Sequence, residues 1–148
     1  VDQSPASPLD MPDHELDAAR PIVAAARRIA VVGVSPNAAR PSHAVAAYLQ
    51  RAGYEIVPVR PGVAEVLGVR AWPDLVAAAA AGPIDVVDVF RPSEVIAELV
   101  PQLLAARPKL AWLQLGIRDD RAAETLREAG IVVVQDHCLK VAHLNWGL

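Results

Sequence analysis

The first third of the chain carries residues suited to binding phosphate. An apolar run ends in glycine, serine and proline, and a helical pattern follows from about residue 41. A helix N-terminus offers unpaired N–H groups and partial positive charge, and neighbouring hydroxyl and guanidinium groups add donors for an anion. These residues predict a site for a nucleotide diphosphate; the alternative is that Gly33 serves only the turn and Ser42 only caps the helix. The residues concerned are Gly33, Val34, Ser35, Pro36, Arg40 and Ser42.

The nucleotide predicted at this turn is not plain NAD. The dinucleotide fingerprint has glycines at three fixed positions, where this chain has Gly33, Ser35 and Ala38. After the next apolar run, Arg60 stands where NAD-binding proteins place an acid for the ribose hydroxyls. A guanidinium pairs well with phosphate, so Arg60 favours a phosphorylated ribose, as in NADP or coenzyme A.

Two later apolar runs end in residues that could face the same ligand. Phe90 and Arg91 end one of them; Phe90 could cover a purine face or belong to the core. Asp88 lies within that run, where a carboxylate is costly unless it is paired or hydrogen-bonded. Arg40 or Arg91 could supply a partner, and a contact to the ligand is the alternative. The other run ends in Leu115 and Gly116, and the glycine allows a ligand to approach the backbone.

Residues 135–143 place acid, imidazole, thiol and amine side chains close together in the sequence. A metal site is disfavoured because His137, Cys138 and His143 have no second cluster of ligands to join them. A nucleophilic thiol is an alternative, although no orienting group is evident. The simplest prediction is that Asp136 caps a terminal helix, with Cys138 in its first turn near the ligand.

The elements that would position these residues alternate between strand and helix. Helical segments separate most of the strands, which predicts an α/β fold with a Rossmann-like, doubly wound parallel sheet of five to six strands in three layers, α/β/α. In the expected order 3-2-1-4-5-6, ligands bind at the carboxyl ends of the strands, where the winding reverses. The predicted strands are residues 29–34, 55–59, 84–90, 110–115 and 131–134, with a weaker one at 68–72.

Length and composition limit the class of protein. The 148 residues fit one domain, placed at residues 13–148, after a mobile segment at 1–12; its first helix is predicted at 13–27, interrupted at Pro21. The net charge of −3 disfavours a nucleic-acid partner. Membrane insertion is not expected, because no apolar stretch approaches the ~20 residues that span a bilayer. The single cysteine and the absence of a leader pattern favour a cytoplasmic location.

Together, these motifs resemble those of the small stand-alone CoA-binding proteins, relatives of the nucleotide-binding domain in the succinyl-CoA synthetase α subunit. The resemblance extends from about residue 28 to residue 143. It rests on Val-Val-Gly-Val-Ser-Pro (31–36), Arg-Pro-Ser (40–42), Tyr-Glu-Ile-Val-Pro-Val (54–59), Val-Asp-Val-Phe-Arg (87–91), Trp-Leu-Gln-Leu-Gly (112–116) and Asp-x-Cys-x-Lys (136–140).

The resemblance implies a Rossmann-type domain that binds coenzyme A, or an acyl-CoA, across these loops. The diphosphate would lie at residues 33–36, the adenosine phosphate near Arg60, and pantetheine toward Gly116 and Cys138. Ligase catalysis is not implied, because the phosphorylated histidine of the wider family and its ATP-grasp partner lie on other domains. The residues expected to contact the cofactor are Gly33, Val34, Ser35, Pro36, Arg40, Ser42, Val59, Arg60, Pro61, Phe90, Arg91, Leu115, Gly116, Asp136 and Cys138.

The expected function is therefore a non-catalytic CoA-binding carrier, sensor or regulator. The alternatives are an NADP-type oxidoreductase fragment, a thiol-active enzyme using Cys138, and a structural protein that binds no nucleotide. An oxidoreductase would need a substrate domain or a proton donor facing the nicotinamide, and no segment of the sequence supplies one. The sequence leaves open the acyl group, a homo-oligomer and any protein partner.

Overall fold

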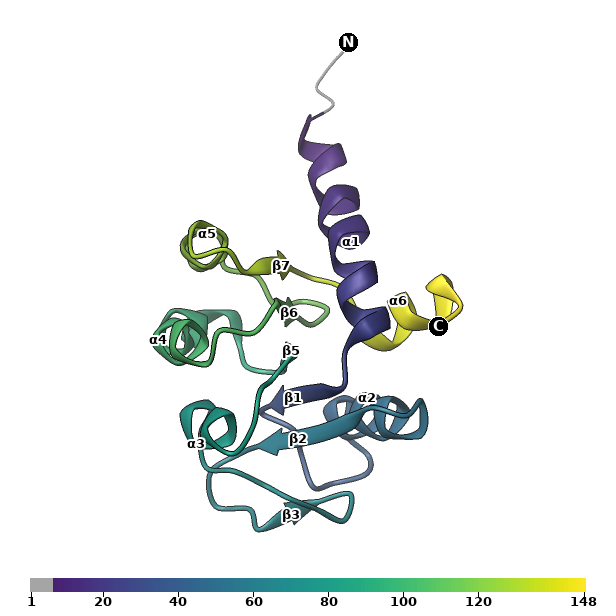
Figure 1. The fold of residues 1–148 in the computed structure, drawn as a ribbon, viewed down its shortest axis with the longest axis vertical. Helices are drawn as coiled ribbons and strands as arrows, with labels where there is room; N and C mark the ends of the chain where they lie inside the picture. The colour runs from purple at the N-terminus through teal and green to yellow at the C-terminus, as the bar shows by residue number, and fades with distance from the viewer. Residues whose placement is uncertain (1–6) are drawn as a thin grey trace.

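A computed structural model of the chain describes the backbone of residues 7–148, with side chains from His14 onward. Five strands form one parallel sheet in the order β2-β1-β5-β6-β7 (Figure 1). The five firm strand predictions and their order are therefore confirmed. The strands are β1 (Arg28–Val32), β2 (Glu55–Val59), β5 (Val86–Val89), β6 (Leu110–Leu113) and β7 (Val132–Val134).

Helices cover both faces of this sheet, which makes the predicted three layers (Figure 1). Helices α1 (Ser7–Ala25), α2 (Pro41–Arg51) and α6 (Leu139–Trp146) pack on one face. The other face is covered by α3 (Leu75–Ala80), α4 (Ile96–Ala106) and α5 (Asp120–Glu128), and the 3-10 helix η1 (Ser93–Val95) leads into α4. Within residues 7–148, no helix has the length and apolar character needed to cross a membrane.

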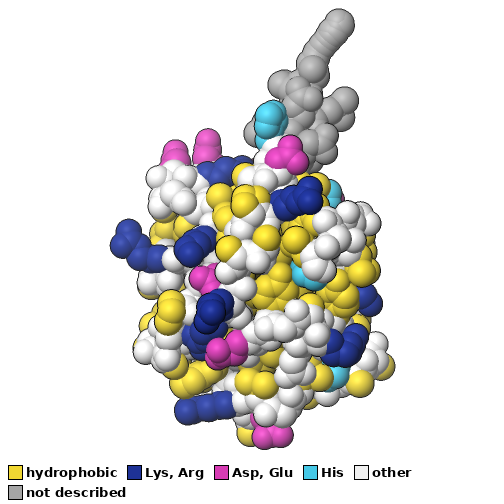
Figure 2. Space-filling model, turned by 45° about the vertical axis from the view of Figure 1, so that its right-hand side comes forward, with side chains coloured by type: hydrophobic (Ala, Val, Ile, Leu, Met, Phe, Trp, Pro, Cys, Tyr) yellow, Lys and Arg dark blue, Asp and Glu magenta, His cyan; other side chains and the backbone are white. Residues whose placement is uncertain are grey.

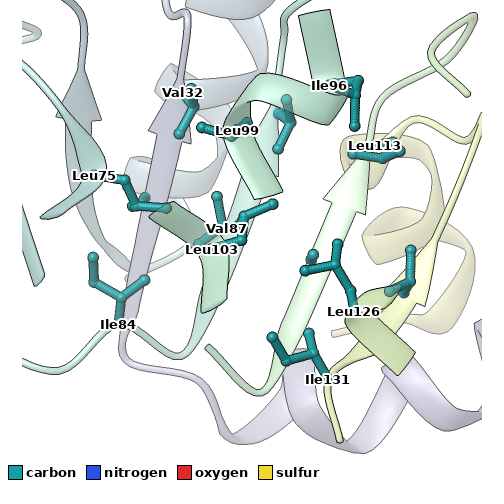
Figure 3. Close-up of a cluster of buried hydrophobic side chains, with 14 of the residues drawn as sticks. Val32, Leu75, Ile84, Val87, Ile96, Leu99, Leu103, Leu113, Leu126 and Ile131 are labelled. Carbon is teal, nitrogen blue, oxygen red and sulfur yellow. The ribbon is translucent and has the colours of Figure 1, made fainter. Parts of the chain in front are cut away.

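Each face of the sheet has its own hydrophobic core, because successive strand residues point to opposite sides. Within β1, for example, Val31 packs toward α1, α2 and α6, whereas Val32 packs toward α3, α4 and α5. Figure 3 shows the second core, where Val87 from β5 meets Leu103 from α4, and Leu126 from α5 lies near β6. Both faces are buried, so the strands are almost wholly apolar.

The outer side of α6 is apolar and exposed. Helix α6 packs inward through Leu139 and His143, which are buried, and turns Val141 and Leu144 outward. Figure 2 shows hydrophobic side chains gathered on the side of the molecule that includes this helix, with Lys and Arg side chains around them. The terminal helix is therefore held through one side only.

The weak strand predicted at residues 68–72 does not join the sheet as a strand. Instead, β3 (Glu65–Val66) and β4 (Val69–Arg70) form a short antiparallel hairpin. Trp72 alone pairs with β2, through a parallel bridge to Val59. A parallel crossover needs a dozen or more residues, so the short connection after β2 folds back on itself instead.

The first helix differs from its prediction at Pro21 and at its N-terminal end. It is continuous through Pro21, so the predicted interruption there is wrong. Proline removes one helical hydrogen bond, and the full burial of Ala19 and Val23 on either side of it offsets that loss. Of the predicted mobile segment, residues 1–6 lie outside the described residues, and the backbone is helical from Ser7.

Candidate functional site

A cleft opens at the carboxyl edge of the sheet, among the loops that follow β1, β2, β5 and β6. Its volume is about 480 Å³, within the range of small-molecule sites. Strands β1 and β5 are neighbours whose following helices cover opposite faces, so the cleft lies where the winding reverses. It is lined by Gly33, Ser35, Asn37, Arg40, Pro41, Ser42, Arg60, Phe90, Arg91, Pro92 and Ile117.

Gly33 brings the ends of β1 and β5 together at the base of this cleft. Its φ of +84° is left-handed, and a Cβ built on it would lie 2.5 Å from the carbonyl oxygen of Phe90. The same Cβ would lie 2.9 Å from Cδ of Arg91. Glycine is therefore required here by the contact between two strand ends, independently of any ligand.

Two serine side chains hold the loop after β1 against the first turn of α2. Ser42 Oγ accepts the N–H of Ser35 at 2.9 Å, and Ser35 Oγ accepts the N–H of Asn37 at 3.0 Å. Ser42 is not the N-cap of α2, which was the alternative prediction; the cap residue is Arg40, and its side chain makes no capping hydrogen bond. In the first turn of α2, Pro41 has no N–H, and the N–H groups of His43 and Ala44 donate to the carbonyl oxygen of Arg40 at 3.1 and 3.2 Å. The Ser42 N–H has no acceptor among the described residues and is the amide of this turn that suits an anion.

Three guanidinium groups, from Arg40, Arg60 and Arg91, line the cleft, and none of its described lining residues is acidic. Arg60 Nη1 donates to the carbonyl oxygen of Val34 at 3.2 Å, which holds this side chain between β2 and the loop after β1. Within residues 14–148, no carboxylate forms an ion pair with any of the three. The cleft therefore concentrates positive charge that the described chain does not neutralise.

Asp88 does not pair with Arg40 or Arg91, and it is not among the residues that line the cleft, so neither of the two partners suggested by the sequence is present. In the sheet register Asp88 lies between Val31 and Trp112, both in the core under α1, α2 and α6. Its side chain is fully buried, and neither carboxylate oxygen has a hydrogen-bond partner among the described residues. Burial raises the pKa of Asp88 well above its usual value, which favours the neutral acid.

A second group of predicted site residues lies beyond the ends of β6 and β7. Asp136 Oδ1 accepts the N–H of Gly116 at 2.6 Å, and the Asp136 N–H donates to the Ile117 carbonyl oxygen at 3.2 Å. Asp136 has a left-handed φ of 58°, uncommon outside glycine. It does not cap α6, as predicted; Cys138 occupies the N-cap position and is half-buried. The aspartate instead ties two loops together.

The remaining predicted residues have backbone roles or lie outside the cleft lining. Val34 and Val59 are buried in the core, and their carbonyl oxygens accept hydrogen bonds from Arg60 and Gly33 respectively. Pro36, Pro61 and Leu115 are exposed, Leu115 to 71%. The predicted residues that the cleft does bring together are Gly33, Ser35, Arg40, Ser42, Arg60, Phe90 and Arg91.

The cleft also contains residues that the sequence did not single out. Asn37 and Pro41 belong to the predicted phosphate loop, so the loop as a whole was the available signal. Pro92 directly follows Arg91, and its position after a predicted strand pointed to this edge. Ile117 enters from the loop after β6, and nothing in its residue type marked it.

Comparison with known proteins agrees with this geometry. Residues 27–144 match the model of the CoA binding domain family. The chain belongs to this family. It is 43% identical over 122 residues to the uncharacterized protein YneT of Bacillus subtilis strain 168, a match covering 82% of this chain and 89% of YneT. The family identified from the motifs is therefore confirmed.

Solved structures of similar proteins share the fold. The cell-free ID.343 protein from Thermus thermophilus superposes with a TM-score of 0.83 at 39% identity, covering 88% of this chain and 97% of that one. A hypothetical protein from Pyrococcus horikoshii OT3 gives 0.82 at 31% identity, covering 88% of this chain and 90% of that one.

The part of the chain matched by the family model includes every residue of the cleft and of the second group. Helix α1 ends at Ala25 and lies outside it.

Proposed function

We propose that the protein binds coenzyme A, or an acyl-CoA, at the carboxyl edge of the sheet, as a carrier, sensor or regulator without a reaction of its own. The observation that carries the proposal is the cleft lined by three guanidinium groups and no described carboxylate, in a chain of the CoA binding domain family. Coenzyme A carries a diphosphate and a 3′-phosphate, so its charge complements that of the cleft.

The described residues fit the phosphate-bearing half of this ligand. The Ser42 N–H, at the start of α2, is assigned to the diphosphate together with the guanidinium of Arg40, which lines the same cleft. Arg60, held by the Val34 carbonyl, is the guanidinium assigned to the 3′-phosphate. Phe90 is half-buried beside the cleft and offers an aromatic face to adenine.

The pantetheine half is assigned to the second group of residues. Ile117 lines the cleft and accepts the Asp136 N–H, so the cleft and the second group share this loop. A Cβ built on Gly116 would meet nothing within 4 Å, which leaves space beside the backbone for an arm of the ligand. Cys138 makes no hydrogen bond to an imidazole among residues 14–148, so a binding role is favoured over the thiol-active alternative.

Titration calorimetry tests the proposal by comparing coenzyme A with dephospho-CoA, NAD and NADP. Coenzyme A is expected to bind at least tenfold more tightly than dephospho-CoA, because a charged hydrogen bond to the 3′-phosphate contributes about 1.5–3 kcal/mol. Arg60→Ala should remove most of this difference. Arg51→Ala, an exposed residue at the far end of α2, is the matched control and should leave it intact.

Two results would contradict the assignment. Equal affinity of the unmodified protein for coenzyme A and dephospho-CoA would remove Arg60 from the 3′-phosphate. Tighter binding of NADP than of coenzyme A would favour the oxidoreductase alternative, which shares the requirement for a cation near a phosphorylated ribose.

A further inference from the structure

The outer side of α6 carries three exposed apolar residues, Val141, Leu144 and Leu148, which we call the α6 face. They are 52%, 56% and 46% exposed. Val141 and Leu144 are neighbours on the helix surface because three residues separate them. The Leu148 N–H donates to the His143 carbonyl oxygen at 3.3 Å, which folds Leu148 back toward the helix. Single exposed hydrophobic residues are ordinary, whereas a group of neighbouring ones is typical of an interaction site.

Helix α6 cannot turn to bury these residues, because specific contacts fix its inner side. The Tyr48 hydroxyl and His143 Nδ1 are 2.6 Å apart, which ties the middle of α6 to α2. The Trp146 ring packs edge-to-face on Trp112 of β6, with 6.1 Å between the ring centroids. The α6 face is therefore a fixed part of the surface (Figure 2).

Cations stand at both ends of the α6 face. Lys140, in the first turn of α6, has its Nζ 5.5 Å from the centroid of the Tyr48 ring, which places it between α6 and α2. At the other end, Arg20 Nη2 of α1 donates to the Trp146 carbonyl oxygen at 3.4 Å. Within residues 14–148, neither cation forms an ion pair with a carboxylate.

Acidic residues are missing from the two helices that Lys140 joins. Neither α2 nor α6 contains an aspartate or glutamate, although acidic residues outnumber basic ones in the whole chain by 17 to 14. Asp17, exposed on α1 one turn before Arg20, offsets part of the charge at that end only. The α6 face is therefore apolar in the middle and cationic at its margins.

This arrangement of charge disfavours a second copy of the chain as the partner. If two α6 helices packed antiparallel about a twofold axis, Lys140 of one copy would lie beside Arg20 of the other. If they packed parallel, each cation would face its own equivalent. Like charges meet in both arrangements, whereas carboxylates of an acidic partner would pair with both cations.

We propose that the α6 face docks an acidic amphipathic helix of a partner protein. Such helices dock through apolar residues spaced three and four apart, which matches a face two turns long. Between residues 140 and 146, α6 rises by roughly 9 Å, so the partner helix would carry carboxylates about two turns apart, on either side of its apolar residues. Because α6 begins directly after Cys138, the docked helix would adjoin the residues assigned to pantetheine. Docking itself requires no ligand.

Two synthetic peptides test this partner chemistry. The first is an amphipathic helix of about 18 residues, with leucines spaced three and four apart and glutamates two turns apart on either side of them. The second has lysines in place of the glutamates. By fluorescence anisotropy, the unmodified protein should bind the acidic peptide on the order of tenfold more tightly than the basic one. Equal binding of the two peptides, or no binding of the acidic one up to about 1 mM, would overturn the proposal.

Variants of the protein locate the binding on the α6 face. Leu144→Gln should weaken binding of the acidic peptide on the order of fivefold, and Lys140→Gln should narrow the preference for it over the basic peptide. Val76→Gln is the matched control: Val76 is 49% exposed on α3, which covers the other face of the sheet, and its replacement should change neither peptide. Equal losses in Leu144→Gln and Val76→Gln would also overturn the proposal.

Two further measurements distinguish an acidic helix from other occupants of the α6 face. In analytical ultracentrifugation the unmodified protein should be a monomer at about 100 µM, and a dimer that Leu144→Gln dissociates would assign the face to a second copy instead. Vesicles of phosphatidylcholine and phosphatidylglycerol should not co-sediment with the protein. Vesicle binding that Leu144→Gln abolishes would assign the face to a membrane surface and overturn the proposal.

The same proteins separate failure of this inference from failure of the proposed function. Coenzyme A affinity should stay within about twofold in Leu144→Gln, because this residue lies outside the cleft. If the unmodified protein binds no coenzyme A, the proposed function fails, and the peptides still decide the docking. If Leu144→Gln does not fold, as judged by circular dichroism, Val141→Gln replaces it with the same expected loss, and unchanged binding of the acidic peptide by that variant would overturn the proposal.

Discussion

Cationic side chains lie at both edges of the sheet. Those at the amino edge form ion pairs with carboxylates of the described chain, whereas those in the cleft at the carboxyl edge do not. At the amino edge, Arg28 Nε lies 3.1 Å from Glu55 Oε2, and Lys109 Nζ lies 3.7 Å from Asp85 Oδ1. Asp85 also accepts the backbone N–H groups of Arg27 and Arg28, at 2.9 and 3.0 Å. At the carboxyl edge, the three guanidinium groups of the cleft have no such partners among residues 14–148.

This difference, and not the volume of the hollows, favours the carboxyl edge as the place for an anionic ligand. The hollow at the amino edge, about 610 Å³, is larger than the cleft at the carboxyl edge, about 480 Å³. Arg28, Glu55 and Asp85 line the larger hollow, and their charges are already used within the protein. An anionic ligand would have to displace those contacts, whereas in the cleft it would supply missing ones.

The largest expected effect concerns the backbone of the carboxyl edge. Gly33→Ala should lower the free energy of unfolding by about 2–5 kcal/mol, from left-handed strain and the clash with the Phe90 carbonyl. Gly116→Ala has the same left-handed φ of +84° but open space, so it should cost only about 1–2 kcal/mol. Urea unfolding of both variants checks the difference; equal losses would mean that Gly33 does not join the strand ends.

The next prediction compares the loss of one arginine at each edge of the sheet. Arg28→Ala should lower the free energy of unfolding by about 1–2 kcal/mol, since it leaves the Pro83 carbonyl and Glu55 without their donor, and should leave ligand affinity unchanged. Arg91→Ala should change stability by about 0.5 kcal/mol or less and weaken coenzyme A binding about tenfold or more.

Thermal or urea unfolding of the two variants measures the change in stability, and titration calorimetry measures the change in coenzyme A affinity. The comparison between the edges breaks down if Arg91→Ala loses as much stability as Arg28→Ala, because Arg91 would then have a partner within the protein. It also breaks down if Arg28→Ala weakens binding as strongly as Arg91→Ala.

The sequence predicted the parts of the fold that depend on local periodicity. Apolar runs of strand length predicted all five sheet strands, and the glycine turn predicted the cleft. Pro21 was misinterpreted because a proline's local cost does not reveal the burial of Ala19 and Val23 around it. Residues 68–72 were misplaced because their residue types do not distinguish a hairpin beside the sheet from a strand within it.

The errors within the site come from contacts between residues far apart in the chain. Asp136 looked like a helix cap because acids are common there, but its partner is the Gly116 amide, on a loop 20 residues earlier. Asp88 looked like a partner for a nearby arginine, but the register of β5 turns it into the core beneath α1, α2 and α6.

The smallest expected effect is on the pH dependence of stability. It compares Asp85, just before β5, whose carboxylate has hydrogen-bond partners, with Asp88, within β5, whose carboxylate has none among the described residues. Burial acts to raise the pKa of Asp85, but the N–H groups of Arg27 and Arg28, with Lys109, lower it below its usual value. Burial alone raises the pKa of Asp88. The two groups should therefore give stability opposite dependences on pH.

The sign follows from which state binds more protons. Asp85 has a lower pKa in the folded protein, so its contribution to the free energy of unfolding is present above the unfolded-state pKa and is lost as pH falls through the folded-state pKa. The Asp85→Asn protein should therefore be less stable than the unmodified protein at neutral pH and equally stable in acid. Asp88 keeps its proton longer in the folded protein, so stability falls as pH rises from the unfolded-state pKa toward the folded-state pKa. Asp88→Asn removes that loss and should gain stability relative to the unmodified protein as pH rises. Urea unfolding from about pH 3 to pH 8 measures both, and a pH-independent difference for Asp88→Asn would mean that Asp88 has a partner that keeps it ionised.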